Sequence, residues 1–72
     1  MKFDYTKLYQ KMIEMKVNQS QLAAMIGMKE PTLSNKLSST TYFKQSEINR
    51  ICTALKISRR KISEYFFALE VQ

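Results

Sequence analysis

Residues 19–37 read QSQLAAMIGMKEPTLSNKL, and this stretch has the features of two short helices joined by a tight turn. Ala23 is the small residue needed where two helices cross closely. Gly27 follows it and supplies the positive φ that the turn requires. The apolar anchors that hold the second helix across the first are Leu22, Ile26, Met28 and Leu33. This spacing predicts a helix-turn-helix at about residues 19–37, whose second helix can enter a DNA major groove.

Apolar residues at spacings of three and four recur on both sides of this stretch and predict further helices. Asp4 is expected as the N-cap of a first helix that runs to about Lys16. Asn18 and Gln21 have the spacing of a capping box at the start of the second helix, which Gly27 ends.

The third helix is expected to begin at Lys29 or Glu30 with Pro31 in its first turn. A fourth helix from about residues 44–46 to residue 56 and a short fifth helix capped by Ser58 complete the fold. The residues expected to face the core are Tyr5, Leu8, Met12, Met15, Leu22, Ala23, Ile26, Leu33, Leu37, Ile48, Ile51, Cys52 and Leu55. The predicted fold class is therefore all-α, with one five-helix domain over residues 1–72 and residues 67–72 as a candidate C-terminal extension.

The composition is typical of a small globular domain, with 72 residues, 44% apolar and 25% charged. One cysteine cannot form an internal disulfide, and the absence of histidine removes the common zinc sites and the ordinary general base. We therefore expect no enzymatic activity, cofactor, metal or small-molecule substrate. There is no apolar run of membrane-spanning length, and the first residues lack the order of a secretory signal, so the expected location is the cytoplasm.

The charge favours an anionic partner, nucleic acid first, because 12 Lys and Arg against 6 Asp and Glu give a net charge of +6. A net charge of this size also serves solubility alone. Many of the cations lie outside the predicted third helix, at Lys7, Lys11, Lys16, Lys56, Arg59, Arg60 and Lys61. On sequence alone, the cluster within residues 56–61 is typical of the solvated start of a helix.

Three blocks carry a resemblance to a known family: residues 18–23 (NQSQLA), residues 33–37 (LSNKL) and residues 57–67. The sequence resembles the lambda-repressor-like domains, the Cro- and CI-type regulators of temperate phages and their bacterial relatives, from Tyr5 to about Phe66. The later blocks and the length are similar to short Cro-like regulators and to modulator-of-repression antirepressors of phages of Gram-positive bacteria. The resemblance implies a regulator of a lysis–lysogeny switch that binds operator DNA in a bacterial host cell.

The resemblance also implies roles for individual residues. Gln19 would bond a phosphate at the start of the second helix, Asn35 would bond an adenine edge and Lys36 would bond a phosphate. Ser38 and Thr40 would add backbone contacts from the following loop. The residues expected to contact DNA are thus Gln19, Lys29, Glu30, Thr32, Asn35, Lys36 and Ser38.

An alternative function is an antirepressor that binds the DNA-binding domain of a partner repressor. Glu30 repels phosphates but can pair with repressor arginines, and the third helix has no arginine to read guanine. The end of the chain is also unusually apolar, with Phe66, Phe67, Leu69 and Val71. These residues either fold back over the first helix or form the surface of a homodimer or heterodimer. The partner-binding candidates are therefore Glu30, Phe66, Phe67 and Leu69.

Overall fold

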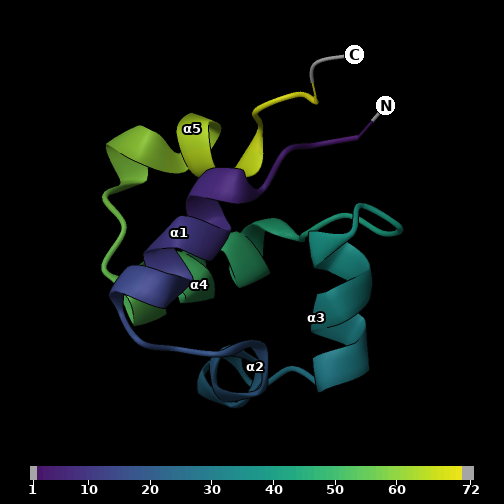
Figure 1. The fold of residues 1–72 in the computed structure, drawn as a ribbon, viewed down its shortest axis with the longest axis vertical. Helices are drawn as coiled ribbons and strands as arrows, with labels where there is room; N and C mark the ends of the chain where they lie inside the picture. The colour runs from purple at the N-terminus through teal and green to yellow at the C-terminus, as the bar shows by residue number, and fades with distance from the viewer. Residues whose placement is uncertain (1, 71–72) are drawn as a thin grey trace.

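The computed structural model describes residues 2–70, which form five α-helices and one short 3-10 turn (Figure 1). The elements are α1 (Thr6–Glu14), α2 (Gln19–Ile26), α3 (Glu30–Leu37), α4 (Gln45–Leu55), η1 (Arg59–Lys61) and α5 (Ile62–Phe66). In this part of the chain the only strand-like pairing is an isolated antiparallel bridge between Phe3 and Leu69. The predicted all-α class with five helices is confirmed.

α1 begins at Thr6, with Tyr5 and not Asp4 at the N-cap position. The prediction of Asp4 as the N-cap was wrong by one residue, because Asp4 lies one position before the N-cap and its side chain bonds the first residue of the helix. Asp4 Oδ1 accepts hydrogen bonds from the hydroxyl and from the backbone N–H of Thr6. These two bonds lower the pKa of the Asp4 carboxyl. α1 ends at Glu14, and Lys16, with a φ of 57°, turns the chain towards α2.

The capping box predicted for α2 is confirmed. Asn18 Oδ1 accepts from the Gln21 N–H, and Gln21 Oε1 accepts from the Asn18 N–H, both at 2.8 Å. Gly27 ends α2 in the left-handed conformation, with a φ of 70°. The N–H of Met28 then returns to the carbonyl oxygen of Ala23 at 2.9 Å, which closes the turn before α3. α3 packs directly against α2.

α4 begins where predicted and ends at Leu55, one residue before the predicted end, because its C-cap Lys56 adopts a left-handed φ of 56°. Ser58 is a cap as predicted, since its Oγ accepts from the Arg60 N–H at 3.3 Å, but it caps η1 and not α5 itself. None of the helices within residues 2–70 has the length and the apolar run needed to span a bilayer.

The core lies where the inner sides of all five helices meet. Its buried apolar residues are Tyr5, Leu8, Met12, Leu22, Ala23, Ile26, Leu33, Leu37, Ile48, Ile51, Cys52, Leu55, Ile57 and Phe66. The predicted core is confirmed except at Met15, which is half-buried because α1 ends before it. Cys52 is 1% exposed, and burial raises the pKa of its thiol.

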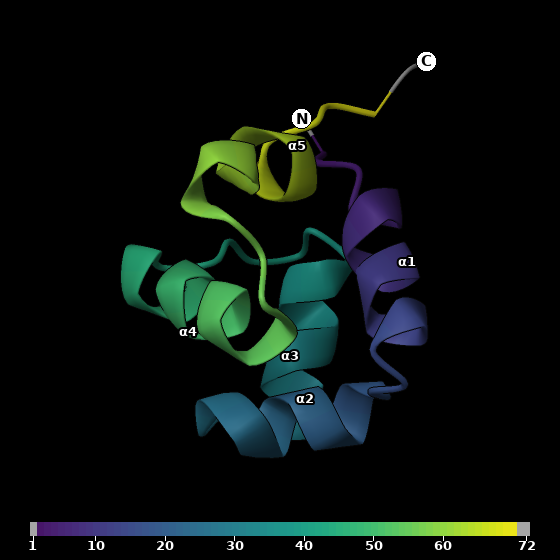
Figure 2. The same ribbon diagram turned by 90° about the vertical axis from the view of Figure 1, so that its left-hand side faces the viewer.

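The two ends of the described chain run beside each other next to α1 and α5 (Figures 1 and 2). The N–H of Asp4 donates to the carbonyl oxygen of Ala68 at 2.6 Å, and the N–H of Glu70 donates to that of Lys2 at 3.1 Å. The segment after α5 therefore pairs with the segment that precedes α1. Val71, which we included in the apolar end of the sequence, lies outside the described residues.

Candidate nucleic-acid interface

Polar residues predicted to contact DNA lie on the exposed side of α3 and at its two ends. Leu33 and Leu37 are buried, which leaves the opposite side of the helix to solvent. We define the α3 surface as the exposed residues Lys29, Glu30, Thr32, Asn35 and Ser38. Thr32 and Asn35 are three positions apart and therefore share one side of the helix. No hydrogen bond within residues 2–70 engages either of these two side chains, so both have free donors and acceptors.

Gln19 occupies the first position of α2 and is half-buried. The N-terminus of a helix carries partial positive charge and free N–H groups, which suit an anionic oxygen. The Asn18 cap satisfies the N–H of Gln21 but not those of the two residues before it. This end of α2 can therefore present N–H groups beside the Gln19 side chain.

The loop after α3 is fixed by hydrogen bonds to the last turn of the helix. The carbonyl oxygen of Asn35 accepts from the Ser38 hydroxyl at 3.0 Å and from the Thr40 N–H at 2.9 Å. The Ser38 and Thr40 hydroxyl oxygens are 2.9 Å apart. Both side chains are exposed. The two hydroxyls predicted to add backbone contacts are thus held together at the end of α3.

Lys36 is the one predicted DNA contact that the structure places inside the molecule. Its side chain is 8% exposed, and its Nζ lies 2.6 Å from Glu47 Oε1 on α4 and 3.2 Å from the carbonyl oxygen of Tyr42. Glu47 Oε1 also accepts from the N–H of Lys44 at 2.7 Å. The prediction that Lys36 bonds a phosphate was therefore wrong, because its buried ammonium group already has the half-buried carboxylate of Glu47 as its partner.

Burial raises the pKa of Glu47, but the bonds from Lys36 and from the Lys44 N–H outweigh it and hold this pKa below the ordinary value. Sequence reasoning missed this ion pair because lysine is normally exposed. A signal was present: Lys36 is three positions after Leu33 and adjacent to Leu37, so it lies on the inner side of α3.

The ion pairs leave most cations free for other partners. In the described part of the chain, Lys7 pairs with Glu64 at 2.5 Å and Lys11 pairs with Glu14 at 3.7 Å, besides the buried pair. Of the remaining cations, Lys29 is the one within the α3 surface. Its only charged neighbour in sequence is Glu30, so this surface carries little net charge of its own.

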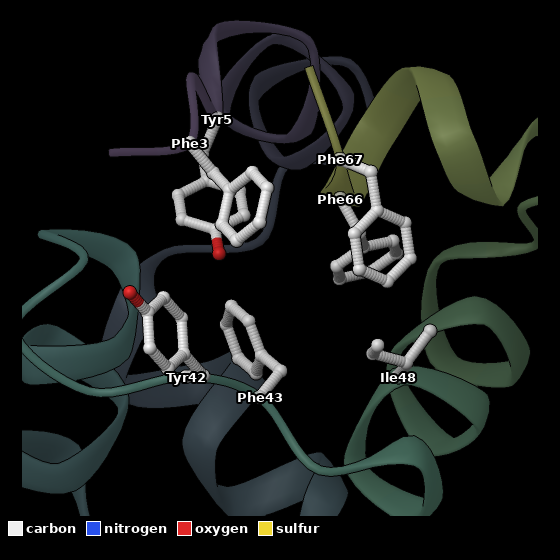
Figure 3. A pocket seen from close by; sticks show the side chains of 7 residues that line it. All are labelled: Phe3, Tyr5, Tyr42, Phe43, Ile48, Phe66 and Phe67. Atoms are coloured by element: carbon white, nitrogen blue, oxygen red, sulfur yellow. The ribbon is translucent and has the colours of Figure 1, made fainter. Parts of the chain in front are cut away.

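Aromatic side chains line an open pocket with a volume of about 290 Å³ at the end of the molecule where the termini lie (Figure 3). Its lining residues are Phe3, Tyr5, Tyr42, Phe43, Ile48, Phe66 and Phe67. Phe3 meets both Tyr42 and Phe67 edge-on, with ring centroids 5.9 and 5.6 Å apart. The pocket is thus an apolar site of the size of a small ligand or of one inserted side chain.

Of the apolar residues predicted to bind a partner, one is buried in the core and two are exposed beside or near this pocket. Phe66 is 1% exposed and packs edge-on against Phe43, so the prediction that it contacts a partner was wrong. Phe67 and Leu69 are 50% and 49% exposed, and Tyr42 across the pocket is 60% exposed. The ring of Tyr42 thus forms an exposed wall of the pocket.

No group of three or more His, Cys, Asp or Glu within residues 2–70 is placed to hold a metal ion. A protein-family model described as "Protein of unknown function (DUF739)" matches residues 1–69 of the chain. No curated protein matches the sequence.

Proposed function

The chain belongs to the DUF739 family, and we propose that it is a non-enzymatic transcriptional regulator of the lambda-repressor-like kind that binds operator DNA. In this proposal α2 and α3 form a helix-turn-helix and the α3 surface enters a major groove. The regulator would act in the cytoplasm of a bacterial host, in a lysis–lysogeny switch. A homodimer would set two α3 surfaces about 34 Å apart, which matches a palindromic operator.

One observation carries the proposal: the turn at Gly27 sets α3 across α2 while Thr32 and Asn35 keep free hydrogen-bonding groups on the exposed side of α3. An asparagine amide can donate to and accept from an adenine edge, and threonine can bond any base. Gln19 and the start of α2 would hold a phosphate and so fix the position of α3 on the duplex.

The test is selection of sites from a random duplex pool by the purified protein, followed by affinity measurements at two salt concentrations. We expect an enriched site and a steep loss of affinity as salt rises, by roughly 0.9 logarithmic units per logarithmic unit of salt for each phosphate contacted. Asn35→Ala should cost about 1–3 kcal/mol of binding and relax the preference at one base pair. Gln10→Ala, an exposed amide on α1, is the matched control and should bind as the wild type does. Weak binding with no enriched site would overturn the proposal.

A second candidate function, antirepression by contact with a Cro- or CI-type repressor, is favoured by the apolar groups around the aromatic pocket. Exposed apolar groups gathered at one place on a small domain typically mark a protein interface. Glu30→Gln separates the two functions. A gain in DNA affinity with loss of antagonism of the repressor supports antirepression, whereas unchanged antagonism removes Glu30 from that interface.

A further inference from the structure

A second concentration of positive charge lies where α4 leads into α5. We define the basic surface as the four exposed side chains of Lys56, Arg59, Arg60 and Lys61. No salt bridge within residues 2–70 involves any of them. The nearest acidic residue along the chain is Glu64, whose carboxylate is already bound by Lys7. Lys61 is close enough to Glu64 to help lower the pKa of that carboxyl, but none of the four cations is held in a salt bridge within residues 2–70, so they are available to an anionic partner.

Arg59 is already held in place on this surface. Its Nη2 donates to the carbonyl oxygen of Asn49 at 3.3 Å and to the hydroxyl of Thr53 at 3.1 Å, both on α4. These bonds occupy one terminal nitrogen of the guanidinium group. An arginine that is already ordered loses less side-chain entropy when its remaining donors bind a phosphate.

A groove between α2 and α4 adjoins the basic surface. It has a volume of about 470 Å³ and is lined by Met25, Asn49, Arg50, Thr53 and Ala54. Arg59 bonds two of these lining residues, and Arg50 contributes a second guanidinium group. Arg59 thus connects the basic surface to a shallow, mostly apolar hollow that Arg50 also lines.

The basic surface and the α3 surface lie on opposite sides of the molecule. In Figure 1 the segment from α4 to α5 is at the left edge and α3 is at the right. In the perpendicular view of Figure 2 the same segment is in front and α3 is behind. The molecule measures 32 × 25 × 22 Å. A straight duplex bound to the α3 surface therefore does not reach the basic surface.

We propose that the basic surface binds the phosphate backbone of a second DNA segment, so that one domain can hold two duplexes together. The proposal rests on the proposed function, because the first duplex occupies the α3 surface. Phosphate is the favoured ligand because two of the four cations are arginines, whose planar forks match its oxygens. The four residues include no apolar group that would enter a bilayer.

The test is a bridging assay with random-sequence duplexes of about 30 base pairs, roughly three helical turns. One duplex is immobilised, the protein is added, and capture of a second, fluorescent duplex is measured. Arg60→Gln with Lys61→Gln removes two charges and leaves the bonds of Arg59 to α4 in place. Lys2→Gln with Lys16→Gln is the matched control, since it removes two exposed charges that form no salt bridge within residues 2–70 and that lie near the two ends of α1. Thermal unfolding checks that both variants fold.

We expect the basic-surface variant to capture about tenfold less of the second duplex, because loss of two phosphate contacts lowers affinity steeply at moderate salt. Its affinity for a single duplex, measured by anisotropy, should stay within about threefold of the wild type, and the control should bridge as the wild type does. Equal capture by wild type and variant would overturn the proposal. So would an equal loss of bridging and of single-duplex binding, because one duplex would then cover both surfaces.

Two further measurements test the identity of the partner and the role of α3 separately. If polyglutamate competes for the basic surface as well as duplex does at equal charge, the partner is an acidic protein and the assignment to DNA is wrong. If Thr32→Ala with Asn35→Ala leaves the affinity for the selected site unchanged, the proposed function fails at α3. Failure of the bridging proposal is read from capture of the second duplex by the basic-surface variant. Failure of the proposed function is read from the affinity of the α3 variant for the selected site, so the two failures can be distinguished.

Discussion

The buried ion pair between Lys36 and Glu47 joins the last turn of α3 to the first turn of α4. The Nζ of Lys36 also reaches the carbonyl oxygen of Tyr42, and Glu47 Oε1 holds the N–H of Lys44, so the pair fixes both ends of the loop between the two helices. Ser38, which belongs to the α3 surface, lies in the same loop. A single pair of charges therefore links the last turn of α3, the loop that follows it and the first turn of α4.

Glu47→Gln should destabilise the protein by about 3 kcal/mol at neutral pH, because it leaves the Lys36 ammonium buried without a counter-charge. The folded-state pKa of Glu47 lies below its ordinary value of 4.5. A lowered carboxyl pKa stabilises the folded state above the unfolded pKa, and this contribution disappears as the pH falls through the folded pKa. The difference between wild type and variant should therefore shrink below about pH 4.5. Urea unfolding followed by circular dichroism at several pH values measures it.

Glu14→Gln provides the control for this pair. Its carboxylate is 69% exposed and lies 3.7 Å from Lys11, so the same substitution should change stability by less than about 0.5 kcal/mol. Equal losses for the two variants, or a loss at Glu47 that does not depend on pH, would contradict the role given to the buried pair.

Residue type was a good guide to the α3 surface and a poor one at Lys36. Thr32 and Asn35 are exposed as their polarity indicates, and Leu33 and Leu37 are buried. Lys36 is buried because Glu47, a residue on another helix, compensates the cost of removing its charge from water. That compensation depends on a contact between distant residues, so it could not be inferred from α3 alone.

At the scale of the elements, four connections between helices pass through a left-handed residue. Gly27 has a φ of 70°, but the other three positions carry a Cβ: Lys16 at 57°, Ser39 at 62° and Lys56 at 56°. Glycine adopts this conformation without a steric penalty, whereas residues with a Cβ do not. The turn at Gly27 could be predicted because glycine is typical of left-handed positions. The turns at Lys16 and Lys56 could not, because lysine does not indicate this conformation.

Gly27→Ala and Lys56→Gly should change stability in opposite directions. A Cβ at Gly27 would meet no atom within 4 Å, so its cost is the left-handed backbone alone. We expect a loss of about 1 kcal/mol for Gly27→Ala and a gain of up to about 1 kcal/mol for Lys56→Gly, after the change in unfolded-state entropy. Chemical unfolding of the two variants measures both values. A gain for Gly27→Ala would show that the turn before α3 is not held in the left-handed conformation.

The ends of a helix could be predicted where the capping residues lie close to that end in the sequence. The Asn18–Gln21 box and Pro31 defined the starts of α2 and α3, because these signals lie within four residues of the helix end. The bridge between Phe3 and Leu69 joins residues from opposite ends of the chain. The alternative in which the apolar end folds back over the first helix anticipated that the two ends meet, but no periodicity in either segment indicates the bridge itself or the pocket beside it.

At the scale of the whole molecule, two hydrogen bonds join the pocket end to the loop that follows α3. The Ser39 hydroxyl accepts from the N–H of Phe3 and donates to its carbonyl oxygen, both at 3.3 Å. Ser39 follows Ser38 of the α3 surface and precedes Tyr42 of the pocket wall. A partner that inserts a side chain into the pocket would therefore act on the loop that also carries the predicted phosphate contacts.

Cys52 provides a single probe of the stability of the whole fold and of its ligands. Its side chain lies in the centre of the core and is 1% exposed, and burial also raises the pKa of the thiol. Both effects suppress attack by a thiol reagent in the folded state, so modification should require unfolding. We expect labelling by a disulfide reagent to be slower than in urea by a factor close to the folding equilibrium constant.

Duplex DNA should slow this labelling further if it binds the folded chain and not the unfolded one. A free duplex concentration of about 100 times the dissociation constant stabilises the folded state by about 2.7 kcal/mol, which corresponds to about 100-fold slower modification. Asn35→Ala should reduce this protection in proportion to its loss of affinity, while its labelling rate without DNA stays close to that of the wild type. Labelling in the absence of denaturant as fast as in urea would place Cys52 outside a stable core. Normal slow labelling that duplex leaves unchanged would instead keep the fold and count against DNA as the ligand.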